Sequence, residues 1–87
     1  MSQGLKRLEA MRRNAAGDWR IADVELVCRT FGVDCSPPSG GGSHYTVSHP
    51  KKVEILTVPA RRPIKPVYIR KLTSYIDDIR SDEDEQG

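Results

Sequence analysis

Apolar residues recur three or four positions apart in the segment that follows Gly17 and Asp18. The set is Ile21, Val24, Val27, Cys28 and Phe31. This spacing is typical of an amphipathic helix with one face against a core. It predicts a helix over residues 19–31, with Asp18 as the N-cap and Gly32 as the glycine that ends it.

A second stripe with helical spacing lies near the C-terminus and consists of Tyr68, Leu72, Tyr75, Ile76 and Ile79, with Ile69 beside it. Pro66 precedes the stripe and suits the first turn of a helix, where its missing N–H has no intrahelical partner. The pattern therefore predicts a helix that starts at Pro66 and buries this stripe.

The polar and apolar positions between the two helices alternate as in strands. From Ser43 to His49, Tyr45 and Val47 face one side while His44, Thr46 and Ser48 face the other. The β-branched run 53–58 predicts the return strand of a hairpin, and residues 33–36 a further short strand. Two prolines and three glycines make 37–42 a loop.

The order helix, three strands, helix predicts an α+β fold. We expect a two-layer sandwich of α-β-β-β-α order, in which two helices cover one face of a small antiparallel sheet. Its other face, with His44, would be open. Residues 1–18 form a basic lead-in, where Leu5, Leu8 and Met11 are compatible with a short helix over 5–14. Residues 19–79 form the domain, and the acidic segment 80–87 is predicted to be disordered.

Composition narrows the class of protein. With 87 residues, 37% of them hydrophobic, the chain holds one small domain and excludes a multi-domain enzyme. We expect no membrane span, no secretory signal and a cytoplasmic location, and two cysteines are too few for a disulfide scaffold. Residues 1–76 carry thirteen Lys and Arg against six acids, which favours a polyanionic partner, nucleic acid first. Charges that are merely solvated remain the alternative.

His44 is the candidate for chemistry. It follows three glycines and Ser43 at the start of a strand. The loop that ends in Gly42 and Ser43 would let a phosphodiester approach closely and offer it amide N–H groups. Histidine is a common proton-transfer group, so His44 could act at a scissile phosphate, although an ordinary exposed histidine fits the spacing too. His49 lies five residues on, would face the other way, and is interpreted as a turn residue.

Two further sets of residues bear on binding. Cys28, Cys35, His44 and His49 lack the two-to-four-residue spacing of a zinc finger, so no metal site is predicted. Basic residues gather in the hairpin turn, the following loop and the start of the last helix, and suit nucleic-acid phosphates. They are Lys51, Lys52, Arg61, Arg62, Lys65, Arg70 and Lys71.

Three segments carry a resemblance to a known family: Gly42-Ser43-His44-Tyr45, a second strand that ends Leu56-Thr57-Val58-Pro59, and the stretch from Ile64 to Leu72. In this order and spacing, the chain over about residues 19–79 resembles the HicA-type toxins of bacterial toxin–antitoxin systems. The resemblance implies a fold like a double-stranded-RNA-binding domain. It also implies an endoribonuclease that cleaves mRNA, needs no metal or other cofactor and uses His44.

The resemblance further implies a HicB-type antitoxin as the partner, with contact to promoter DNA only through the antitoxin complex. Tyr45 stands where many family members have a second histidine. Two other classes of protein stay open. One is a non-catalytic module that binds double-stranded RNA, and the other is a protein whose open sheet face only docks a partner.

Overall fold

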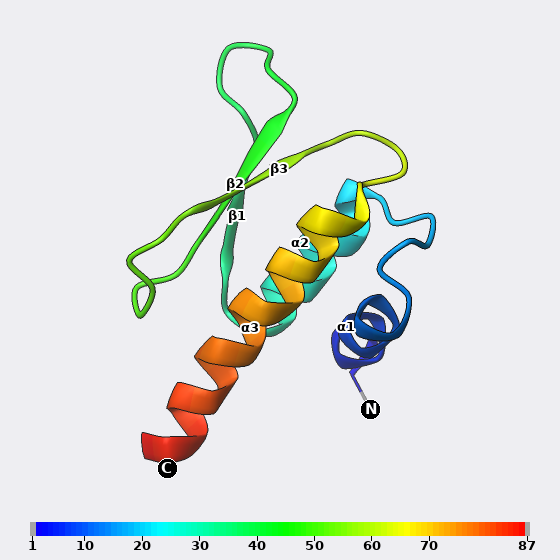
Figure 1. Cartoon of the computed structure of the whole chain (residues 1–87). Coiled ribbons are helices and arrows are strands. Elements are labelled where there is room, and N and C mark those ends of the chain that lie inside the picture. Colours follow the sequence, from blue (N-terminus) through cyan, green and yellow to red (C-terminus); the bar gives the residue numbers. More distant parts are fainter. Residues whose placement is uncertain (1, 87) are drawn as a thin grey trace.

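The predicted α+β class and the order of elements are confirmed in a computed structural model, which describes residues 2–86 and the side chains up to Ser81. The three strands form one antiparallel sheet in the order β1-β2-β3 (Figure 1). The elements are α1 (Gln3–Arg13), α2 (Ile21–Thr30), β1 (Asp34–Ser36), β2 (His44–Ser48), β3 (Leu56–Pro59) and α3 (Pro66–Gln86). Within the described residues, the helices are too short or too polar to cross a bilayer.

Helix α2 lies near the predicted position but starts differently. Its N-cap is Arg20, whose backbone N–H donates to Oδ2 of Asp23 over 2.9 Å. Asp18 is therefore not the cap, and its carboxylate lies 3.6 Å from the Arg20 guanidinium instead. The predicted glycine at the C-terminal end is confirmed: Gly32 has φ +68°, a conformation that side chains with a Cβ disfavour. The next amide, of Val33, donates to the Cys28 carbonyl over 2.8 Å, which completes a Schellman-type end.

The sheet shows the predicted two faces. Val47 and Val58 point to the helices and are 0% and 2% exposed, whereas His44 and Thr46 are exposed. Strand β3 begins at Leu56, so the predicted start at residue 53 is wrong. Strand β2 ends at Ser48, and the chain then turns at Pro50, where the Lys52 amide donates to the His49 carbonyl. Residues 53 and 54 consequently have no strand beside them.

Helix α3 begins at Pro66 as predicted and buries a continuous stripe: Ile69, Leu72, Tyr75, Ile76 and Ile79. Tyr68 is only partly buried, so the stripe runs through Ile69. The helix continues to Gln86, although the acidic composition predicts disorder from residue 80. Extending an existing helix needs no new nucleus, and glutamate and glutamine are good helix formers. Gly87 lies outside the described residues.

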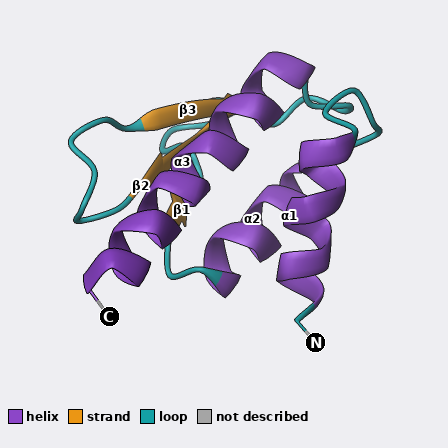
Figure 2. Cartoon of the chain, turned by 60° about the horizontal axis from the view of Figure 1, so that its bottom comes forward, coloured by secondary structure: helices purple, strands orange, loops and turns teal. Residues whose placement is uncertain are grey.

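Helix α1 belongs to the fold and is not a separate lead-in. Leu8 and Met11 are fully buried in the same core as the α2 and α3 stripes. Gly4 faces Thr30 of α2 so closely that a Cβ built on it would overlap the threonine side chain. Figure 2 shows α1 beside α2, on the side away from the strands. The sheet and the pair α2–α3 thus form the two predicted layers, and α1 is added to the helical layer because only there can its apolar face be buried.

Candidate functional site

His44 is the first residue of β2 and its side chain is exposed. Its backbone position is fixed by the ladder: His44 lies opposite Pro59, and the Ala60 amide donates to the Ser43 carbonyl over 2.7 Å. The glycine loop precedes it. Gly40 and Gly41 have φ of +74° and +88°, which favours glycine, so the tight turn rests on these two residues.

Gly42 differs from the two glycines before it. Its φ lies outside the left-handed region, and a Cβ built on it would lie 3.5 Å from the Pro38 Cβ, an ordinary contact. The backbone geometry therefore gives no reason for glycine at this position. A glycine here does keep the approach to Ser43 and His44 free of a side chain.

A cavity of about 410 Å³ opens beside His44. It joins the start of β2, the end of β3, the following loop and the start of α3. Its lining is Ser43, His44, Pro59, Arg61, Lys65 and Tyr68. Two cations and an imidazole face this cavity and no carboxylate lines it, so among the described residues it has the composition of an anion-binding site. Three of the predicted RNA-binding residues, Ser43, Arg61 and Lys65, are thus brought to His44.

Arg62 is not among the residues that line this cavity. Its guanidinium lies 3.9 Å from the Asp18 carboxylate, at the end of the loop that joins α1 to α2. Arg61 and Arg62 therefore lie on different surfaces: Arg61 lines the cavity, and Arg62 lies near the start of α2.

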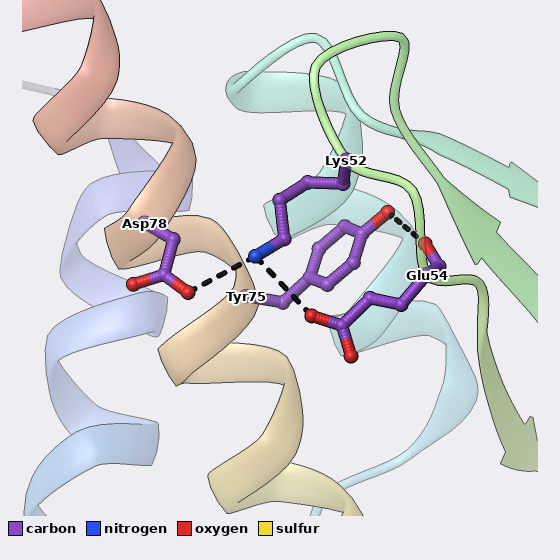
Figure 3. A network of polar contacts seen from close by, with 4 residues as sticks. All are labelled: Lys52, Glu54, Tyr75 and Asp78. Atoms are coloured by element: carbon purple, nitrogen blue, oxygen red, sulfur yellow. Dashed lines mark hydrogen bonds and ion pairs between the residues drawn. The ribbon is translucent and has the colours of Figure 1, made fainter.

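Lys52 is anchored to α3, as Figure 3 shows. Its Nζ lies 3.0 Å from Oδ2 of Asp78, 3.2 Å from Oε1 of Glu54 and 5.3 Å from the centre of the Tyr75 ring. The Tyr75 hydroxyl donates to the Glu54 carbonyl over 3.0 Å. The hydrogen bonds to Asp78 and then Glu54 raise the pKa of Lys52. This lysine therefore holds the β2–β3 loop on α3, and its predicted role as a phosphate contact does not fit its surroundings.

The other residues at this turn are Lys51 and His49. Lys51 is exposed, and its amide donates to Nδ1 of His49 over 3.1 Å. His49 is thus the turn residue that the sequence indicates. Because five residues of strand span about 16 Å, His44 and His49 stand at opposite ends of β2 and do not share one substrate phosphate.

A larger groove of about 700 Å³ runs along the edge of the sheet, between β3 and α3. Its walls are residues 54–58 on one side and one face of α3 on the other, with His44 and Tyr68 shared with the smaller cavity. The face of α3 includes Tyr68, Lys71, Tyr75 and Asp78.

Sequence reasoning missed Tyr68 as a site residue by assigning it to the core stripe. The four groove residues Tyr68, Lys71, Tyr75 and Asp78 repeat with the spacing of the buried stripe Ile69, Leu72, Ile76 and Ile79, displaced by one residue. The two stripes are adjacent faces of one helix. Tyr75 belongs to both faces, since it is 2% exposed and part of the core, whereas Tyr68 is only partly buried.

The two cysteines form a local pair away from His44. Both are free, and each thiol affects the pKa of the other. The interaction with Cys35 and burial raise the pKa of Cys28, and the interaction with Cys28 lowers the pKa of Cys35. No group of three or more His, Cys, Asp or Glu side chains is gathered for a metal ion in the part of the chain that the structure describes.

Comparison of the chain with protein-family models, with curated proteins and with solved structures gives no match, so the site is interpreted from its own geometry.

Proposed function

We propose that this protein is an endoribonuclease that cleaves mRNA without a metal ion, with His44 as the proton-transfer group. The observation that carries the proposal is the 410 Å³ cavity, in which an exposed imidazole, Arg61 and Lys65 meet without a carboxylate. A phosphodiester is an anion, and cations at such a position bind it and stabilise the extra charge of its transition state.

The arrangement of the two motifs gives a second line of support. The segment that ends Gly42-Ser43-His44 and the segment Ile64–Leu72 are about twenty residues apart in the sequence. Each supplies residues to the same cavity: Ser43 and His44 from the first, Lys65 and Tyr68 from the second. These are the segments on which the resemblance to HicA-type toxins depends, and their meeting at one cavity is what a shared active site requires.

The proposed reaction is the attack of a ribose 2′-hydroxyl on the adjacent phosphorus. The P–O5′ bond breaks, and the products are a 2′,3′-cyclic phosphate and a 5′-hydroxyl. His44 either takes the proton of the 2′-hydroxyl or gives one to the leaving 5′ oxygen, and such a group contributes about 10²- to 10⁴-fold. The Tyr68 phenol or a water molecule performs the other proton transfer. Arg61 and Lys65 hold the phosphate oxygens.

The test is incubation of the purified chain with a long RNA in the presence of EDTA. His44→Asn is compared with His49→Asn, a matched control because the chain has only these two histidines. We expect cleavage by the unchanged chain and by His49→Asn, at least a hundredfold slower cleavage by His44→Asn, and no cleavage of DNA of the same sequence. Equal rates for both variants would refute the role of His44. Binding without cleavage would favour the double-stranded-RNA-binding module. The absence of both binding and cleavage would favour a docking protein.

A toxin of this kind would act in the cytoplasm and be neutralised there by a HicB-type antitoxin. Expression of the unchanged chain in bacteria without an antitoxin should stop growth, and His44→Asn should not. A short reading frame beside this gene whose product restores growth would support the partner, and contact with promoter DNA would then require that complex.

A further inference from the structure

The sheet is narrower than the helical layer on which it lies. Adjacent strands are about 4.8 Å apart, so a three-stranded sheet is about 14 Å wide. A helix with its side chains is about 10–12 Å wide, so a layer of two helices is at least about 20 Å wide. Strand β1 contacts α2, and β3 contacts α3. The groove between β3 and α3 is the part of the helical layer that the sheet does not reach.

Apolar side chains are exposed at this uncovered strip. Ile55 and Val67 line the groove and are 61% and 46% exposed, and Val53, two residues before Ile55, is fully exposed. They come from two separate segments, the approach to β3 and the first turn of α3. In the described part of the chain these three are the exposed large hydrophobic residues, and two of them line one groove. Such a concentration marks an interaction surface.

The backbone of β3 presents unpaired groups to the same strip. The Ala60 amide bonds the Ser43 carbonyl, and by the alternation of an antiparallel ladder the hydrogen-bonded pairs that follow are Val58 with Tyr45 and Leu56 with Val47. The N–H and C=O of Thr57 therefore point away from β2, toward the open edge. The other edge, β1, is only three residues long and is followed directly by two prolines, whereas in β3 the one proline is the last residue, Pro59, and the outward N–H of Thr57 stays available.

The charges along the groove favour an acidic occupant. Arg70 and Lys71 line it, and neither has an acidic partner among the side chains that the structure describes. The acids at its far end, Glu54 and Asp78, are already paired with Lys52.

From these observations we infer that the groove binds an extended segment of a partner protein, which adds to the sheet as a fourth strand beside β3. Because successive side chains of a strand face opposite sides, the partner strand would place acidic residues on the helix side, within reach of Arg70 and Lys71 of α3. Its apolar residues would then face the other side, beside Ile55. Exposed apolar residues and a free backbone edge suit a polypeptide better than RNA, which offers neither a backbone ladder nor aliphatic side chains.

The position of the strand has a consequence for His44. The groove and the smaller cavity share His44 and Tyr68, so the end of a bound strand lies at the entrance of the cavity. Inhibition of RNA cleavage by such a strand rests on the proposed function. The binding itself does not, since no contact of the strand with β3 requires a catalytic histidine.

The test uses a nine-residue peptide of alternating valine and glutamate and the full chain, followed by amide hydrogen exchange. We expect saturable binding and at least tenfold slower exchange of the Thr57 amide, with the β1 amides unchanged. A peptide methylated on alternate backbone nitrogens should not bind, since it cannot form the ladder. In the double variant Arg70→Glu/Lys71→Glu, affinity for the glutamate peptide should fall at least tenfold. A peptide with lysine in place of glutamate should bind this variant more tightly than it binds the unchanged chain.

Three outcomes would overturn the inference: no binding at about 1 mM peptide, binding that leaves Thr57 unprotected, or protection of the Thr57 amide by an RNA oligomer and not by the peptide. His44→Asn keeps the two proposals apart. Peptide binding by this variant with no RNA cleavage by the unchanged chain would refute the nuclease alone. RNA cleavage without peptide binding would refute the fourth strand alone.

Discussion

Replacing Gly4 by alanine tests the close contact between α1 and α2. In an open helix this change is stabilising, by at most about 1 kcal/mol, because alanine has the higher helix propensity. Here the added Cβ would overlap Oγ1 and Cβ of Thr30 and lie 2.7 Å from its Cγ2. The threonine cannot rotate away, because its Cβ belongs to the rigid part of the side chain and its hydroxyl donates to the Leu26 carbonyl over 2.8 Å.

The size of the effect follows from two opposing contributions. Insertion of a methyl group into a closely packed contact costs about 1–3 kcal/mol, which exceeds the propensity gain. We expect Gly4→Ala to lower the free energy of unfolding by about 1 kcal/mol. For a domain of this size that corresponds to a fall in Tm of about 4–8 °C.

The assay is urea and thermal unfolding followed by the fluorescence of Trp19, the single tryptophan, whose Nε1 donates to the Asn14 carbonyl in the α1–α2 connection. Lys6→Ala, at an exposed position of α1, is the control and should change stability little. In a Thr30→Gly background, which removes the obstructing side chain, Gly4→Ala should become neutral or stabilising. If Gly4→Ala raises Tm equally in both backgrounds, α1 does not pack on α2 at this point and the reasoning fails.

Two further predictions concern ionisable groups. Because a raised pKa stabilises the fold only while the group is protonated, Lys52→Met should reduce the free energy of unfolding by a constant amount between about pH 6 and 9. That difference should shrink as the pH rises above 10.5, the ordinary pKa of lysine, and a difference independent of pH would contradict the Lys52–Asp78 contact. Since the Cys28 thiol lowers the pKa of Cys35, iodoacetamide should modify Cys35 first. In Cys28→Ala the pH midpoint of that alkylation, followed by mass spectrometry, should move up toward 9.0, and an unchanged midpoint would argue against the thiol pair.

Some residues of the candidate site can be placed from the sequence, and others cannot. His44 at the mouth of β2 and His49 in the turn follow from strand periodicity, which is a local property. The residues that surround His44 in the cavity do not follow from strand periodicity. Arg61 and Arg62 are neighbours in sequence, yet one lines the cavity and the other reaches Asp18, because side-chain direction in an irregular loop depends on the packing of the loop.

Long-range contacts also decide the roles of single residues. Lys52 resembles any basic turn residue until α3 brings Asp78 and Tyr75 to it (Figure 3). By its spacing in the sequence Tyr68 fits the apolar stripe of α3. Its position in the groove depends on how the helix is rotated about its axis against the sheet.

The elements with strong periodicity could be predicted from the sequence, namely α2 with its glycine end, the two faces of β2 and the start of α3 at Pro66. Their signals are local: spacing, a left-handed turn and a missing N–H. The tertiary structure alone decided that α1 is buried, because Leu8 and Met11 make too short a stripe to hold a helix without the surface that α2 and α3 offer. It also decided where β3 begins and that a groove opens beside it, since both depend on how far a three-stranded sheet extends over two helices.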